Sequence, residues 1–190
     1  MPQSIGSVVD YTLRLATLDD VPAIRELIAR SAHGLAAADY TREQLDAALT
    51  GAFGVDTALI RDGTLFVAET HARVVVACGG WGRRRTLFGS DARAERDETL
   101  LDPKSDPAKI RAFFVDPAHA RRGIGRALLA RCEADALRAG FSSFETMATL
   151  PGMRLYGQCG YVPQAAIDYA LPGGLTIRFV PMRKTGRPAP

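Results

Sequence analysis

The fold of this chain is decided by the stretch Arg111-Ala112-Phe113-Phe114-Val115-Asp116-Pro117-Ala118-His119-Ala120-Arg121-Arg122-Gly123-Ile124-Gly125-Arg126-Ala127. Its apolar beginning predicts a buried strand, Asp116-Pro117 ends that strand, and the turn around Gly123 and Gly125 opens an amphipathic helix. Glycines let backbone N–H groups approach a ligand, and the helix directs its positive dipole end to the same place. Such a turn suits an anion, most naturally a pyrophosphate, although glycines can also serve only to turn the chain into the helix.

Two common nucleotide-binding patterns have the same order of strand, turn and helix, and the sequence excludes both. A dinucleotide-binding fingerprint requires a third glycine where this chain has Leu128. A P-loop requires a glycine, four further residues and then Gly-Lys-Ser or Gly-Lys-Thr, and the chain contains no such run. An anion site here would therefore belong to a different class of fold.

Two separated motifs resemble those of the GCN5-related N-acetyltransferases. Val115-Asp116-Pro117 and Ala120-Arg121-Arg122-Gly123-Ile124-Gly125 align with motif A, in which a strand ending in Val-x-Pro precedes Gln/Arg-x-x-Gly-x-Gly/Ala. Leu155-Tyr156-Gly157-Gln158-Cys159-Gly160-Tyr161 matches the Leu-Tyr-x-x-x-Gly-Phe/Tyr signature that closes the core of the family. The resemblance covers roughly residues 13–182, and its specific part is 111–161.

The chain departs from the family pattern at three positions. Ala120 stands where glutamine or arginine is usual, which removes a side chain but leaves the backbone donors of the turn in place. Thr149 and Gly152 stand where the family often has asparagine and alanine. We therefore expect pyrophosphate binding to survive, because it depends on backbone groups.

The resemblance implies an α/β fold with a mixed, mostly antiparallel central sheet, helices on both faces and a central β-α-β unit that binds acyl-CoA. In the family, two parallel strands, here 110–115 and 144–149, splay apart, and the pantetheine arm of acetyl-CoA hydrogen-bonds between them. No metal is expected. The residues that the resemblance assigns to the cofactor are Phe113, Phe114, Val115, Arg121, Arg122, Gly123, Ile124, Gly125, Arg126, Ala127 and Thr149.

The resemblance also implies direct transfer of the acetyl group to a primary amine, with Tyr156 as general acid. The leaving group is a thiolate, and a free thiol has a pKa of about 8.5 against about 10 for a tyrosine hydroxyl. A tyrosine placed at the sulfur therefore donates a hydrogen bond or a proton as the C–S bond breaks. The alternative is a core tyrosine that only packs its short helix.

The general base is harder to assign. An aliphatic ammonium group has a pKa of about 10.4 and must lose a proton before it attacks, yet the strand 110–115 carries no carboxylate. Glu145 on the neighbouring strand is the first candidate for the base. The alternative is that Glu145 is a solvated residue on a solvent-facing edge of the sheet. His119 is expected to support the pyrophosphate turn. Weaker candidates for the base are Asp91, Glu95 and Glu69.

Composition limits the remaining possibilities. A chain of 190 residues with 47% hydrophobic residues fits one domain with a substantial core. The net charge of +3 suits an anionic cofactor, whereas a nucleic-acid-binding domain is supported only by the basic balance and by Arg83-Arg84-Arg85. No apolar stretch is long enough to cross a bilayer. Three cysteines without metal-ligand spacing, and a start without a signal pattern, predict a reduced, cytoplasmic protein.

We expect residues 1–10 to be a mobile start, 11–183 to form a single domain and 184–190 to form a tail. Residues 83–108 are polar, lack helical or strand periodicity and are predicted to be an insertion loop. Thr17 with Asp20 and Thr41 with Gln44 predict two helix starts. The other expected elements are strands at 11–16, 64–69, 73–79, 164–171 and 175–182, a loop at 33–40, and a short helix from 151 to 160.

Two features of the expected sheet leave alternatives open. Gly79-Gly80 is compatible with a β-bulge or a close backbone approach to a ligand, and equally with a simple strand end. The final hairpin or an exposed sheet edge is compatible with a homodimer. For function, the alternative to an enzyme acting on a small-molecule or peptide amine is a non-catalytic acyl-CoA-binding regulatory module. Substrate selectivity is expected to lie in the 33–40 loop and the polar insertion.

Overall fold

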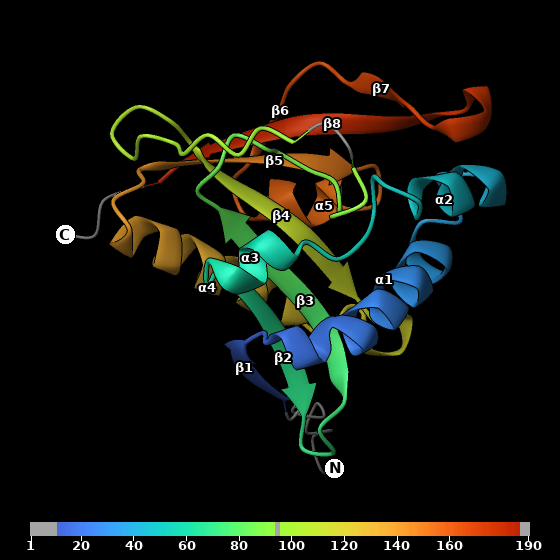
Figure 1. Cartoon of the computed structure of the whole chain (residues 1–190), viewed down its shortest axis with the longest axis horizontal. Helices are drawn as coiled ribbons and strands as arrows, with labels where there is room; N and C mark the ends of the chain where they lie inside the picture. Colours follow the sequence, from blue (N-terminus) through green and yellow to red (C-terminus); the bar gives the residue numbers. More distant parts are fainter. Residues whose placement is uncertain (1–10, 94–95, 187–190) are drawn as a thin grey trace, which may run out of the picture.

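The computed structural model of the chain describes residues 11–93 and 96–186. Its described part contains one eight-stranded sheet in the order β1-β2-β3-β4-β5-β8-β6, with β7 paired to β8 (Figure 1). β4 and β5 are parallel and all other neighbours are antiparallel, which confirms the mixed, mostly antiparallel sheet. The strands are β1 (Tyr11–Leu15), β2 (Leu65–Thr70), β3 (Val75–Gly82), β4 (Ala108–Val115), β5 (Ser143–Thr149), β6 (Val162–Pro163), β7 (Ile167–Ala170) and β8 (Thr176–Thr185).

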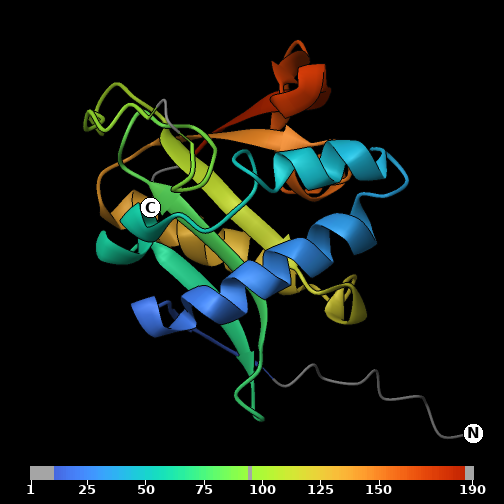
Figure 2. The ribbon, with the colours of Figure 1, turned by 45° about the vertical axis from the view of Figure 1, so that its right-hand side comes forward.

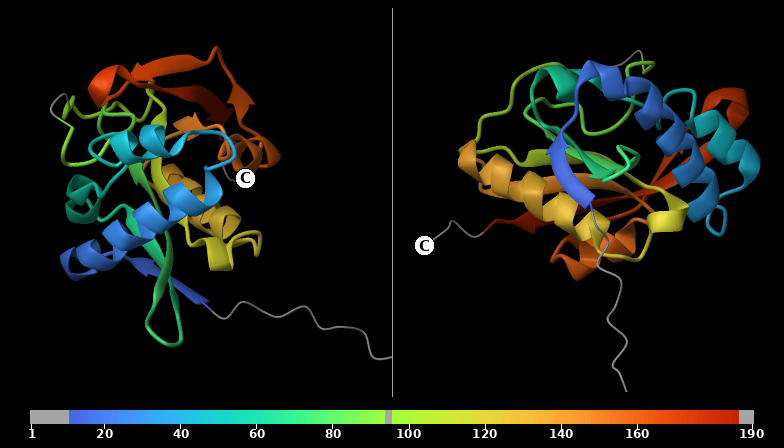
Figure 3. Two further views of the ribbon diagram at one scale, coloured as in Figure 1. Left: turned by 90° about the vertical axis from the view of Figure 1, so that its right-hand side faces the viewer. Right: turned by 90° about the horizontal axis from the view of Figure 1, so that it is seen from below.

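Helices cover both faces of the sheet (Figures 2 and 3). One face carries α1 (Val21–Leu35), α2 (Arg42–Ala48) and α3 (Thr57–Arg61), and the other carries α4 (Ile124–Arg138) and α5 (Met153–Gln158). Neighbouring side chains on a strand point to opposite faces, so Phe66 packs in the apolar cluster with α4 while Val67 packs in the cluster with α1. The sheet therefore separates two apolar cores.

The helices on the α1 face begin where local side chains cap them. The capping box predicted at α2 is present, since Thr41 N–H donates to Gln44 Oε1 at 2.8 Å and Gln44 N–H donates to Thr41 Oγ1 at 3.3 Å. The predicted loop at 33–40 is too long, because α1 continues to Leu35. The sequence did not reveal α3, which is five residues long and begins where Asp56 accepts a hydrogen bond from Ala58 N–H at 3.1 Å.

A bulge in β3 resolves the alternatives left open at Gly79-Gly80. The strand continues to Gly82, and its register with β4 shifts between Cys78 and Gly80. A Cβ atom on Gly79 would lie 2.8 Å from the ring of Phe113. Gly79 is therefore a bulge residue whose missing side chain makes room for an aromatic ring of β4.

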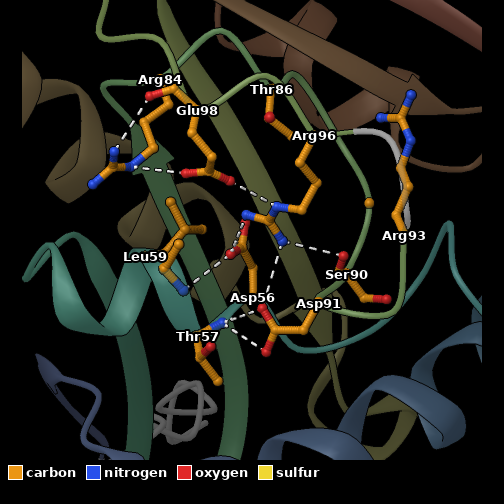
Figure 4. Close-up of polar contacts among 12 residues, drawn as sticks. Asp56, Thr57, Leu59, Arg84, Thr86, Ser90, Asp91, Arg93, Arg96 and Glu98 are labelled. Atoms are coloured by element: carbon orange, nitrogen blue, oxygen red, sulfur yellow. Dashed lines mark hydrogen bonds and ion pairs between the residues drawn. The ribbon is translucent and has the colours of Figure 1, made fainter.

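Charged groups of the polar insertion hold it against the residues that flank α3 (Figure 4). Its last expected residue, Ala108, already belongs to β4, and the rest of its described part contains a single isolated bridge, between Arg84 and Leu100, and no helix. Arg96 Nη2 donates to the buried Asp56 at 2.8 Å. Arg84 pairs with Asp62, which follows α3, at 2.9 Å. Arg84, one of the three arginines that suggested nucleic acid, is thus engaged within the molecule.

The boundaries of the C-terminal elements differ from the expected ones. β8 runs to Thr185 and so includes the first two residues of the expected tail. The structure leaves 1–10 and 187–190 outside its described residues, so it does not test the predicted mobile start or most of the tail. Among the residues it describes, no helix is long and apolar enough to span a membrane.

Candidate active site

The site is built on a gap between the two parallel strands. Only 108–110 of β4 pair with 144–146 of β5, although both strands continue beyond these residues. The separation coincides with Ala112, whose φ of 59° lies in the left-handed region that residues with a side chain rarely adopt. Past Ile110, β4 therefore has an edge that is free of pairing with β5, as the resemblance led us to expect.

A cavity of about 670 Å³ occupies this gap. Some of its lining residues belong to the apolar core on the α4 face, among them Phe113, Val115 and Tyr156. Others belong to the core on the α1 face, among them Phe53 and Phe179. The cavity therefore passes through the sheet at the gap between β4 and β5 and is lined from both faces.

The turn before α4 leaves backbone donors free at the edge of this cavity. Gly123 is the N-cap residue, with φ 83° and no side-chain capping hydrogen bond, and a Cβ placed on it would meet no atom within 4 Å. The first N–H groups of a helix have no partner inside the helix. Arg121 and Arg126 line the same end of the cavity and form no ion pair with any described residue. This end is therefore suited to an anion.

Tyr156 lies on α5 and lines the cavity, with 5% of its surface exposed. Its ring packs edge-on against Phe113 with centroids 6.1 Å apart, and Thr146 of β5 is a further lining residue near its hydroxyl. Burial raises the pKa of Tyr156 well above its ordinary value, against the smaller opposing effect of Thr146. The hydroxyl thus stays protonated and can donate a hydrogen bond to an anion in the cavity.

A family model for the acetyltransferase (GNAT) domain matches residues 61–163, more than half of the chain. The chain belongs to the GNAT family of acetyltransferases. Both motifs described above and the parallel pair β4–β5 lie inside the matched region. It is therefore an N-acetyltransferase of the class that uses acetyl-CoA.

Solved structures share the GNAT fold along nearly the whole chain. A GCN5-related N-acetyltransferase from Rhodopseudomonas palustris has a TM-score of 0.67 at 19% identity, covering 93% of this chain and 96% of its own. YncA from Salmonella typhimurium, solved with acetyl-CoA, has a TM-score of 0.61 at 22% identity, covering 95% and 98%. PaiA N-acetyltransferase from Thermoplasma acidophilum, solved with coenzyme A, has a TM-score of 0.62 at 11% identity, covering 93% and 99%. A comparison with curated protein sequences gives no significant match.

Most residues that the resemblance assigned to the cofactor of this GNAT protein line the cavity. Two do not: Arg122 is exposed, and Ala127 lies in the first turn of α4, where its N–H donates to Gly123 O at 3.0 Å. Those that line the cavity are Phe113, Phe114, Val115, Arg121, Gly123, Ile124, Gly125, Arg126 and Thr149.

The structure does not bring Glu145 to the cavity. It lies opposite Lys109, in the stretch where β4 and β5 are still paired. Its Oε2 accepts from Lys109 Nζ at 2.7 Å and its Oε1 accepts from Arg183 Nη2 at 3.3 Å. The carboxylate is therefore occupied in a nearly buried ion pair and does not lie at a solvated edge.

The weaker candidates for the base do not line the cavity either. Glu69 is paired with Arg14, Asp91 accepts hydrogen bonds from Thr57 N–H, and Glu95 falls outside the described residues. Among the described residues, no carboxylate lines the cavity. His119 does line it, beside the turn that it was expected to support.

Sequence reasoning missed several lining residues. Ser31 is a buried polar residue among the apolar positions of α1, and this break in the apolar pattern could have been noticed in the sequence. Its Oγ accepts a hydrogen bond from Val115 N–H at 3.2 Å. Arg154 precedes the tyrosine signature closely but has no distinctive pattern of its own. Phe53, Phe88 and Phe179 come from three distant segments, so no local pattern could bring them together.

Proposed function

We propose that this GNAT protein transfers the acetyl group of acetyl-CoA directly to a primary amine, with the Tyr156 hydroxyl stabilising the departing thiolate. The observation that carries the proposal is the cavity through the sheet. It joins the uncapped start of α4, the free edge of β4 and the Tyr156 side chain in one space. Cofactor and acceptor then meet at the gap, from opposite faces.

The cofactor half of the site rests on backbone groups. We assign the pyrophosphate to the N–H groups at the start of α4, with Arg121 and Arg126 adding positive charge. A side chain at Gly123 would project into the open space from which the N–H groups are reached. The pantetheine arm is assigned to the backbone of β4 beyond Ile110, where β5 no longer pairs with it.

The reaction requires a neutral amine and a stabilised leaving group. The amine nitrogen attacks the thioester carbonyl carbon, a C–N bond forms, and the C–S bond breaks with its electron pair on sulfur. Because burial raises the pKa of Tyr156 far above the value of about 8.5 for a free thiol, complete proton transfer from tyrosine to sulfur is uphill. The favoured role of Tyr156 is hydrogen-bond donation to the thiolate, and the amine proton leaves through water.

Calorimetric titration with acetyl-CoA, CoA and dephospho-CoA tests the cofactor half. Saturable binding at micromolar concentrations or below is expected for acetyl-CoA. Absence of binding by all three would refute the assignment of the turn. Thiol release during incubation with amines tests transfer, and binding without thiol release for any amine would favour the regulatory acyl-CoA-binding module.

A further inference from the structure

The α1-face end of the cavity is enclosed by aromatic rings. Phe53 lies with its ring centroid 5.9 Å from that of Phe114 and 6.1 Å from that of Phe179. Phe88, from the insertion, packs on Phe179 at 5.3 Å and on Tyr169 of β7 at 4.9 Å. The remaining side chains of this end are small or aliphatic and come from Ala32, Leu35, Ala36, Ala52, Leu87 and Met147.

No charged group of the described residues faces this end unpaired. The cationic lining residues Arg121, Arg126 and Arg154 come from the turn before α4, from α4 and from α5, on the cofactor face. His119 lies in the short segment Pro117–His119 that packs against α1, and its Nδ1 lies 3.8 Å from Asp116. Arg111 is the exception, and its guanidinium pairs with Asp56 at 2.6 Å and donates to Thr86 O and Gly89 O, each at 2.7 Å. Since no described carboxylate lines the cavity, an ammonium group would find no anionic partner there.

From this lining we infer that the acceptor is an amine that carries an aryl or comparably large apolar group and reacts from its neutral form. The inference rests on the proposed acetyl transfer and specifies its substrate class. Burial of an apolar group of the acceptor against these rings is favourable. A polycation gains no ion pair there, because no carboxylate lines the cavity to offset the desolvation of its charges. At pH 7 about one in 2,500 molecules of an amine with pKa 10.4 is neutral, against about one in seven for an α-amino group. Aryl amines of lower pKa are therefore the best acceptors.

Phe88 is the aromatic residue that the insertion contributes to this end of the cavity. The two carbonyls that bind Arg111 belong to Thr86 and Gly89, which flank it. The Arg93 guanidinium lies over its ring, 4.5 Å from the centroid. Arg111 of the sheet and Arg93 of the same loop therefore hold the Phe88 ring in place as one wall of the cavity.

Steady-state thiol release with four acceptors tests the inference: L-phenylalaninamide, 2-phenylethylamine, ethanolamine and spermidine. We expect kcat/KM for the two aryl amines to exceed that for ethanolamine by about 100-fold, the effect of burying one phenyl group. Phenylalaninamide should surpass phenylethylamine at pH 7, and the difference should narrow as pH rises. Equal or better use of ethanolamine or spermidine would overturn the inference.

Two variants assign the selectivity to Phe88. Phe88→Leu keeps an apolar side chain but removes the ring, and should raise KM for both aryl amines about tenfold with the acetyl-CoA Kd unchanged. Leu100→Ala, at a 61% exposed position of the same insertion, is the matched control and should change neither value. Acetyl-CoA binding without transfer to any of the four amines would also overturn the inference. Loss of acetyl-CoA binding itself would instead refute the proposed function.

Discussion

Tyr156 shows how much the environment of one residue adds to its position in a motif. The match to the family signature predicted which tyrosine to examine. It did not predict that the ring packs against Phe113 and Tyr161, or that the side chain is buried. The Phe113 ring comes from β4 and holds the tyrosine ring beside the cavity, while burial raises the pKa of the hydroxyl and keeps it protonated.

Replacing this hydroxyl should separate chemistry from binding. In Tyr156→Phe the ring still packs against Phe113, but the thiolate loses its donor, so we expect kcat to fall by about 10²–10⁴-fold with the acetyl-CoA Kd nearly unchanged. Thiol-release kinetics and calorimetry measure the two quantities. Tyr161→Phe is the matched control, because Tyr161 packs on Tyr156 at 5.5 Å without lining the cavity, and its kcat should change only a few-fold.

The pH profile gives a second test of the same residue. A pKa raised by burial means that Tyr156 keeps its proton to higher pH than a free tyrosine does. In the wild type, kcat/KM should therefore rise with pH as the amine deprotonates, without a falling limb below about pH 10. A falling limb below that pH that disappears in Tyr156→Phe would contradict the assigned protonation state.

At the scale of elements, sequence patterns predicted those helices, strands and turns that are determined by interactions between neighbouring residues. The strand ending at Val115, the glycine turn and the start of α4 follow from neighbouring residues, and so does the capping box of Thr41 and Gln44. The docking of the insertion does not, because it depends on Asp56 meeting Arg96 forty residues later. The same holds for Glu145, whose pairing with Lys109 follows only from the strand register.

The insertion should depend on one buried carboxylate. Asp56 is 1% exposed and pairs with Arg96 at 2.8 Å and Arg111 at 2.6 Å. Asp56→Asn therefore leaves the buried Arg111 without its counter-ion and Arg96 with only its more exposed partners, Asp91 and Glu98. We expect the free energy of unfolding in urea to fall by about 3–5 kcal/mol. Glu98→Gln removes a half-exposed partner of the same Arg96 and should cost less than about 1 kcal/mol. Equal losses in the two variants would show that burial does not distinguish these pairs.

At the scale of the whole molecule, the sheet both separates and joins the two cores. Each apolar cluster packs on its own face, but both contribute lining to the cavity at the gap between β4 and β5. The motifs predicted the sheet and the parallel pair. The aromatic end of the cavity was not predictable, because the α2–α3 connection, the insertion, β4 and β8 meet there only after the chain has folded.

A ligand that contacts both cores should stabilise the molecule as one unit. Acetyl-CoA at 100 times its Kd should raise the free energy of unfolding by about 2.7 kcal/mol. The increase in the free energy of unfolding should be the same when unfolding is followed by far-UV circular dichroism and by the fluorescence of Trp81, the single tryptophan of the chain. Trp81 is buried on the α4 face, where its indole N–H donates to Asp135 Oδ2 at 2.9 Å, and it does not line the cavity. A shift seen by only one of the two probes would mean that the faces unfold separately.

Variants at the turn show whether this stabilisation comes from the anion site. Gly123 has φ 83°, a conformation that asparagine and aspartate tolerate better than other residues with a side chain, and its missing Cβ faces open space. Gly123→Asp and Gly123→Asn therefore impose similar backbone strain, but only aspartate adds a negative charge where the pyrophosphate is proposed to bind. We expect the acetyl-CoA-dependent stabilisation to be lost in Gly123→Asp and largely kept in Gly123→Asn. If both variants kept this stabilisation equally, the phosphates of acetyl-CoA would have to bind elsewhere, because the carboxylate of Asp at position 123 would repel phosphates bound beside it.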